Sequence, residues 1–180
     1  LLDGAKLRQE TVRVCLKDME LAASLLIKCY KSGGKMLLCG NGGSAADSQH
    51  IAAEMVGKFN RLRKALPAIA LTTDTSALTA IGNDFGFEHV FARKVEAHGN
   101  KGDVLIAIST SGNSKNILLA AKTAKKLGMK VIGLTGKSGG LLKPLCDICI
   151  CVPSDQTPRI QEIHISIGHI LCEEIESELF

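Results

Sequence analysis

The first group of residues that could bind a ligand or take part in catalysis is a glycine loop, Gly40-Asn41-Gly42-Gly43-Ser44. It follows an apolar run and precedes a helical pattern. The loop satisfies the loose G-x-G-x-x-G/A template of dinucleotide-binding folds. That template requires only a tight turn from a strand into a helix whose first amides face an anion, which suits many phosphorylated ligands. An NAD-binding oxidoreductase also needs an acidic residue about 20 positions beyond the glycines. Asp74 lies more than 30 positions beyond Gly40, which disfavours an oxidoreductase.

A second loop, Ser109-Thr110-Ser111-Gly112-Asn113-Ser114, offers four hydroxyls between a strand-like run and a helical pattern. Hydroxyl donors together with the amides of a helix N-terminus can bind a phosphate without any Lys or Arg. The alternative is a serine-rich turn in which Ser114 only caps the helix, but capping needs one such residue and not four. A Walker A loop is excluded because no Gly-Lys-Ser/Thr sequence follows. The loop therefore predicts a phosphate site.

The helix that follows the glycine loop carries His50 and Glu54, four residues apart and therefore on one face. Such a pair can share a divalent ion. The alternative is an isolated surface pair, which would stabilise the helix by only about 0.2–0.5 kcal/mol. In the last helix, polar side chains interrupt an apolar face at Gln161, His164 and His169, and buried polar groups without partners are costly. A ligand or a neighbouring chain would satisfy them.

Gln161 and His169 are eight residues apart, about 12 Å along an ideal helix and about 80° around it. A single helix would therefore struggle to place both on one ion. A second chain supplying one of them is the hypothesis that this spacing favours.

These residues must be positioned by short apolar runs that alternate with helical patterns. Strand–helix repeats of this kind predict right-handed crossovers and a doubly wound sheet of about five parallel strands, with ligands at the carboxyl ends of the strands. Both polar loops fall at that edge. The predicted strands are Lys35–Cys39, Ala68–Leu71, Val104–Ser109, Val131–Thr135 and Ile148–Val152. The predicted helices are Lys6–Lys31, Ser44–Lys58, Ser76–Asn83, Phe85–His98, Ser114–Leu127 and a last one from about Pro158.

The first helix, at about residues 5–31, and the last helix are longer and more apolar than one small sheet needs. They predict burial against other subunits, and the alternative is packing on their own sheet alone.

Composition is typical of one α/β domain over residues 1–180, with its core at 35–180. Apolar residues make up 46% and aromatic residues 3%, so the chain offers few surfaces for stacking nucleic-acid bases. The net charge of +4 comes from dispersed Lys and Arg, which disfavours a polybasic arm.

Seven cysteines in apolar runs favour buried free thiols over a redox or metal pair at Cys146-x-x-Cys149. With no apolar run approaching 18 residues, we expect a cytoplasmic protein without nucleic-acid or membrane partners.

Five segments together resemble the sugar isomerase (SIS) domain family, and within it the phosphoheptose isomerases. They are GNGGSAADSQHIAAE, Thr72-Thr73-Asp74, GNDFGFE from Gly82 to Glu88, STSGNS and RIQEIHISIGHI. The resemblance covers nearly the whole chain. It implies a homotetramer with active sites at subunit boundaries. The implied reaction converts sedoheptulose 7-phosphate into D-glycero-D-manno-heptose 7-phosphate through an enediol, for bacterial lipopolysaccharide or capsule heptose.

The resemblance also implies roles for individual residues. The implied phosphate cradle is Ser109, Thr110, Ser111 and Ser114. The other implied substrate contacts are Asn41, Gly42, Gly43, Glu54, Asn83, Asp84 and Gln161. The implied ligands of one zinc ion per subunit are His50, Glu54, Gln161 and His169.

Within that set, Glu54 and His169 are the implied acid–base pair. An aldose–ketose isomerisation moves protons between neighbouring carbons, which needs an acid and a base beside the sugar. A carboxylate held by zinc is a poorer base, so ligation and proton abstraction by Glu54 compete. Other SIS-fold proteins sense sugar phosphates, or bind the replication initiator protein as non-enzymatic tetramers. Such proteins can dispense with the carboxylate and the imidazole, so the presence of both favours an enzyme.

Overall fold

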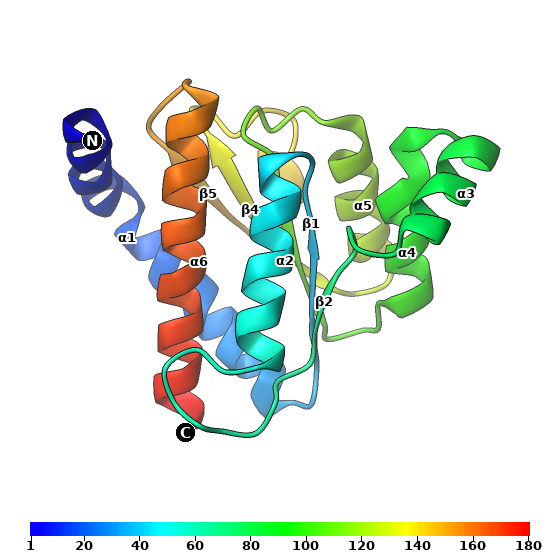
Figure 1. The fold of residues 1–180 in the computed structure, drawn as a ribbon, viewed down its shortest axis with the longest axis horizontal. Coiled ribbons are helices and arrows are strands. Elements are labelled where there is room, and N and C mark those ends of the chain that lie inside the picture. The colour runs from blue at the N-terminus through cyan, green and yellow to red at the C-terminus, as the bar shows by residue number, and fades with distance from the viewer.

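Five short strands form one parallel sheet in the order β2-β1-β3-β4-β5 in the computed structural model, which describes residues 1–180 (Figure 1). This confirms the predicted doubly wound parallel sheet. In-register pairs such as Leu38 with Ile106 join neighbouring strands, so the strands end at a common edge. The strands are β1 (Met36–Cys39), β2 (Ala68–Ala70), β3 (Val104–Ile108), β4 (Lys130–Gly136) and β5 (Ile148–Val152).

Helices cover both faces of the sheet. They are α1 (Leu2–Lys31), α2 (Gly43–Val56), α3 (Thr75–Phe85), α4 (Val90–His98), α5 (Lys115–Lys126) and α6 (Thr157–Leu179), with short 3-10 turns at Phe87–His89 and Lys143–Leu145. The predicted helix Phe85–His98 is wrong at its start. Gly86 ends α3 with φ +90°, a left-handed conformation that favours glycine, and a 3-10 turn separates it from α4.

The alternation of β1 divides the core into two layers. Met36 and Leu38 face one layer, beneath α1, α2 and α6, while Leu37 and Cys39 face the other, beneath α4 and α5. All four side chains are buried, as both faces of a parallel sheet require. The two layers fix α2 and α6 on the same face, side by side (Figure 1).

Several apolar side chains remain exposed on the surface of the single chain. On α1 they include Val12, Val14 and Leu16, each about half exposed. Helix α3 has no buried residue, and Phe85 at its end is 53% exposed. Adjacent exposed apolar groups of this kind are typical of interaction surfaces.

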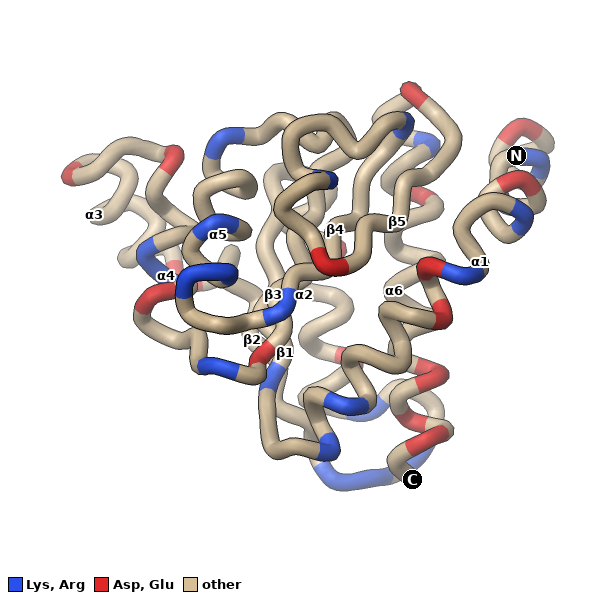
Figure 2. Tube along the Cα trace, turned by 180° about the vertical axis from the view of Figure 1, so that it is seen from behind, with Lys and Arg blue, Asp and Glu red and all other residues tan.

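Charge placement follows the sequence pattern, whereas the prediction of buried thiols is wrong for Cys146, Cys149 and Cys151, which are only partly buried. Figure 2 shows basic and acidic positions interspersed over the fold, without a continuous basic stripe. All seven cysteines carry free thiols, and four of them are buried. No helix combines the length and the apolar character that crossing a bilayer requires.

Candidate active site

The two polar loops meet because β1 and β3 are adjacent in the sheet. Together with residues at the start of α6, they line a cavity of about 250 Å³. The side-chain amides of Asn41 and Asn116 bond each other reciprocally, at 2.9 and 2.8 Å, and so tie the glycine loop to α5. The lining residues are Asn41, Gly42, Gly43, Ser44, Ile108, Ser109, Thr110, Ser114, Thr157 and Gln161.

The serine loop presents hydroxyls to this cavity. Ser109 Oγ and Ser114 Oγ lie 3.1 Å apart, and Ser114 precedes α5 without using its side chain as a cap. The capping-only alternative therefore does not account for Ser114. Ser111 is not among the residues that line the cavity, and its Oγ accepts from the Asn113 amide at 3.1 Å. Hydroxyls and the first amides of α5 together suit a phosphate group.

Helices α2 and α6 run in the same direction away from the cavity and approach each other closely. A Cβ atom at Gly168 would lie 2.5 Å from Ile51 Cδ1, so any larger residue there would force Ile51 to move. At the cavity end, the Gln161 amide covers Gly43 in the same way. Residues on the facing sides of the two helices are therefore brought together level by level.

One such level holds His50, Glu54 and His169. His50 Nε2 lies 3.1 Å from Glu54 Oε1 and 3.3 Å from His169 Nε2. One nitrogen or oxygen of each of the three residues lies within 4.8 Å of the others. Two imidazole nitrogens and a carboxylate oxygen, partly open to solvent, are the donor set of catalytic zinc sites. The residues present therefore fit the metal that the sequence predicts.

Gln161 lies at a different level of the same interface. It is eight residues before His169 on α6 and lines the cavity beside the glycine loop. Both side chains face α2 of their own chain. The distance from Gly43 to His50 along α2 is seven residues, or about 10 Å.

Asn83 and Asp84 are not brought to this site within one chain. They lie exposed near the end of α3, where Asn83 Nδ2 donates to Asp84 Oδ1 at 2.8 Å. Figures 1 and 2 show α3 at one end of the molecule, well apart from α6. Neither residue lines the cavity.

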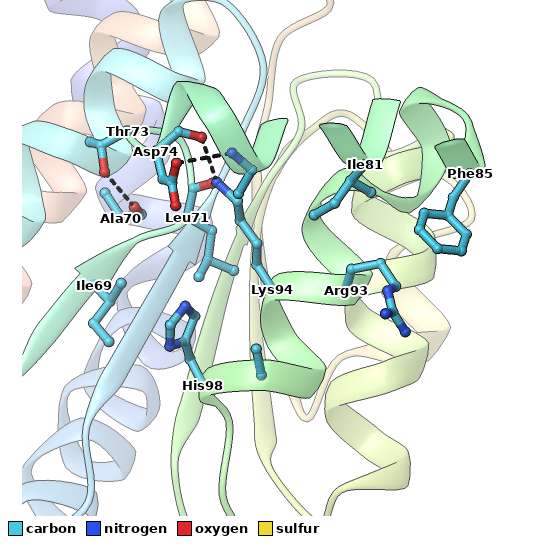
Figure 3. Close-up of a pocket in the computed structure, with 12 residues that line it drawn as sticks. Ile69, Ala70, Leu71, Thr73, Asp74, Ile81, Phe85, Arg93, Lys94 and His98 are labelled. Atoms are coloured by element: carbon cyan, nitrogen blue, oxygen red, sulfur yellow. Dashed lines mark hydrogen bonds between the residues drawn. The ribbon is translucent and has the colours of Figure 1, made fainter. Parts of the chain in front are cut away.

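The start of α3 is held by a buried amine. Lys94 on α4 lines a pocket of about 320 Å³ beside β2 and α3 (Figure 3). Its Nζ donates to the carbonyls of Leu71 at 3.1 Å and Asp74 at 3.0 Å. Burial lowers the pKa of Lys94, and the charge of Asp74 opposes that shift. The Asp74 carboxylate in turn caps α3 by accepting from the Ala77 amide at 2.9 Å.

Sequence reasoning missed Asp47, one turn before His50 on α2. Its Oδ2 is buried without a hydrogen-bond partner. Burial raises the pKa of this carboxyl group, and His50 opposes the shift. The i, i+3 spacing from His50 was the only signal in the sequence, and a single Asp at that spacing is common on helix surfaces.

His164 is a core residue and not part of the site. Its Nε2 lies 3.1 Å from the Thr135 carbonyl oxygen, and the side chain is fully buried. Burial lowers the pKa of His164 to about 4, although the Thr135 carbonyl opposes the shift. The fold therefore holds a neutral imidazole in place.

Acidification is expected to destabilise the fold through His164. The unfolded chain takes up a proton near its ordinary pKa of 6.5, whereas the folded chain resists protonation until about pH 4. The contribution of His164 to the free energy of unfolding is therefore fully present above pH 6.5. It declines by about 3 kcal/mol as the pH falls from 6.5 to 4. Urea unfolding of the wild type and of His164→Leu across this range measures the difference in slope. The exposed His98→Gln serves as the control, and equal slopes for all three proteins would contradict the assignment.

Comparisons with known proteins identify the family of this chain. Residues 4–136 match the model of the SIS domain. The chain belongs to the SIS domain family. A phosphoheptose isomerase from a Nitratiruptor species is 65% identical over 155 residues, which cover 86% of this chain and 83% of the relative.

Two solved structures resemble the chain over nearly its full length. The phosphoheptose isomerase from Neisseria gonorrhoeae is 49% identical with a TM-score of 0.93, covering 98% of this chain and 94% of its own. That from Francisella tularensis is 43% identical with a TM-score of 0.94, covering 97% and 93%. The resemblance to the phosphoheptose isomerases inferred from the sequence is confirmed, and these relatives favour an enzyme over a binding-only SIS protein.

Proposed function

We propose that the chain is an aldose–ketose isomerase that converts sedoheptulose 7-phosphate into D-glycero-D-manno-heptose 7-phosphate. One observation carries the proposal. A hydroxyl-lined cavity and the cluster of His50, Glu54 and His169 lie on the same α2–α6 interface, about 10 Å apart along α2. An extended seven-carbon sugar phosphate with its ester in the cavity would bring its carbonyl end to the cluster. The high identity to phosphoheptose isomerases supports this substrate.

The proposed chemistry uses two side chains as acid and base. Glu54 removes the proton from one carbon and returns it to the neighbouring carbon, and His169 exchanges protons with the sugar oxygens. Glu54 Oε1 faces His50, whereas Oε2 has no hydrogen-bond partner. Oε2 is therefore free to accept the proton, although zinc bound to the same carboxylate would lower its basicity.

The proposed cofactor is zinc, held by His50, Glu54 and His169. Bound there, it would polarise the carbonyl and stabilise the negative charge that develops on the oxygen, a contribution of several kcal/mol. Gln161 lines the cavity, and in this proposal its amide binds the sugar. It would become a fourth zinc ligand only if its side chain turned toward His169 along the α2–α6 interface.

We propose a homotetramer in which residues 1–180 form one SIS domain. The exposed apolar side chains of α1 and α3 support burial between chains. The distance of Asn83 and Asp84 from the cavity supports a site completed by α3 of another chain. We further propose that the enzyme acts in the cytoplasm, in heptose synthesis for lipopolysaccharide or capsule. Free cysteines suit that compartment.

The test is conversion of sedoheptulose 7-phosphate before and after metal removal. We expect the zinc-loaded protein to form the aldose phosphate, and chelation to lower kcat by about 100-fold or more. Restoring zinc after dialysis should recover the rate. Absence of product from the zinc-loaded protein would contradict the isomerase. An unchanged rate after complete chelation would contradict only the metal.

A further inference from the structure

The segment that follows α2 folds back over α6 around one buried ion pair. Glu176 on α6 accepts from the amides of Asn60 and Arg61, each at 2.8 Å, and from Arg63 Nε at 2.8 Å. The Arg63 side chain is 0% exposed and that of Glu176 is 3% exposed. A buried pair of charges is tolerated only when hydrogen bonds replace the lost water, and these bonds do so. Removing either partner would leave the other charge buried and unpaired.

The Arg63 guanidinium also caps the C-terminal end of α2. Its Nη1 donates to the Met55 carbonyl and its Nη2 to the Glu54 carbonyl, both at 2.9 Å. The last carbonyls of a helix lack partners within the helix, and a cation is favourable beside them. Arg63 therefore fixes the backbone of the helical turn that carries the Glu54 carboxylate.

Phe59 connects the same segment to the other side of the cluster. Its amide donates to Glu176 Oε1 at 3.3 Å. Its ring centroid lies 5.6 Å from that of His169, with the planes 37° apart. The His169 ring also lies 5.0 Å from the ring of His50, edge to face. The imidazole therefore contacts both an aromatic ring whose backbone is anchored by Glu176 and a residue of α2.

We propose that Arg63, Glu176 and Phe59 are positioning residues, which set the distance between Glu54 and His169 without touching the substrate. Arg63 fixes the Glu54 side of the cluster through the end of α2. Glu176 fixes the His169 side through Phe59. The effect on catalysis rests on the isomerase proposed above. A displacement of about 1 Å in reacting groups can lower a rate by about 100-fold, so a small shift of this segment is sufficient.

The experiment compares Glu176→Gln with Glu178→Gln, a matched control two residues along α6. Glu178 makes an exposed ion pair with Lys31, with side chains 55% and 53% exposed. We expect Glu176→Gln to lower kcat by about 100-fold with KM little changed, because the phosphate cavity is distant. We also expect the His169 imidazole resonances, assigned with His169→Gln, to shift in the substrate-free protein. Glu178→Gln should match the wild type in both measurements.

A second variant, Phe59→Leu, guards against loss of folding in Glu176→Gln because it leaves the ion pair intact. We expect its kcat to fall by about 10-fold, within the range for residues that orient ligands of a site. Wild-type kcat and unmoved His169 resonances in a folded Glu176→Gln would overturn the proposal, as would wild-type kcat in Phe59→Leu. If the wild type proves inactive while Glu176→Gln still shifts the His169 resonances, the positioning role stands and the proposed function fails.

Discussion

Replacing Glu54 with Gln is expected to lower kcat for sedoheptulose 7-phosphate by about three orders of magnitude. The amide keeps the shape of the carboxylate and the 3.1 Å approach to His50 Nε2, but it cannot accept a proton from carbon. General base catalysis contributes about 10²–10⁴-fold, so its loss should dominate the rate. KM should change less, because the cavity proposed to bind the phosphate is lined by other residues.

Deuterium exchange into the substrate carbons isolates the proton-transfer step. In heavy water, the wild type should incorporate solvent deuterium at C1 or C2, and Glu54→Gln should not. Glu96→Gln is the control, because Glu96 pairs with Arg93 in an exposed i, i+3 bridge on α4. Undiminished exchange by a folded Glu54→Gln would assign proton abstraction to another group, and Asp47, which interacts electrostatically with His50, would be the next carboxylate to test.

The parallel sheet could be predicted because its strands are short apolar runs, each followed by a polar loop and a helical pattern. The run Val104–Ile108 is buried at every position, and both faces of a central parallel strand require apolar residues. The sequence also predicted a division between two helices after Asn83, but not its position, since α3 continues to Phe85 and α4 begins only at Val90. That position depends on Gly86 adopting φ +90°, which the amino-acid type permits but does not require.

The site was predictable where its residues share one element. His50 and Glu54 are paired by helical spacing alone. The approach of His169 depends on α6 lying against α2, which Gly168 permits but which no local pattern specifies. The contact between Arg63 and Glu176 joins residues 113 positions apart, so only the tertiary fold reveals it. Asp47 was missed for the same reason, since its burial is a property of the packed helix.

Mixing two inactive variants is expected to restore about one quarter of the wild-type activity. The variants are Asp84→Ala, on α3, and His169→Gln, on α6. Within one chain α3 and α6 lie well apart (Figures 1 and 2), so the proposed complete site takes the two residues from different chains. When chains assort at random, about one site in four combines an intact His169 with an intact Asp84.

Co-expression with two affinity tags yields mixed assemblies, expected to be tetramers, and kcat per site measures the recovery. A second pair of variants, Gln161→Ala with His169→Gln, is the matched control. Both of its positions face α2 of the same chain, so every site in these tetramers that has one residue intact lacks the other. We expect recovery in the first mixture and none in the second. Recovery in the second would instead favour a Gln161 supplied by a neighbouring chain, and recovery in neither would place the whole site within one chain, with Asp84 acting elsewhere.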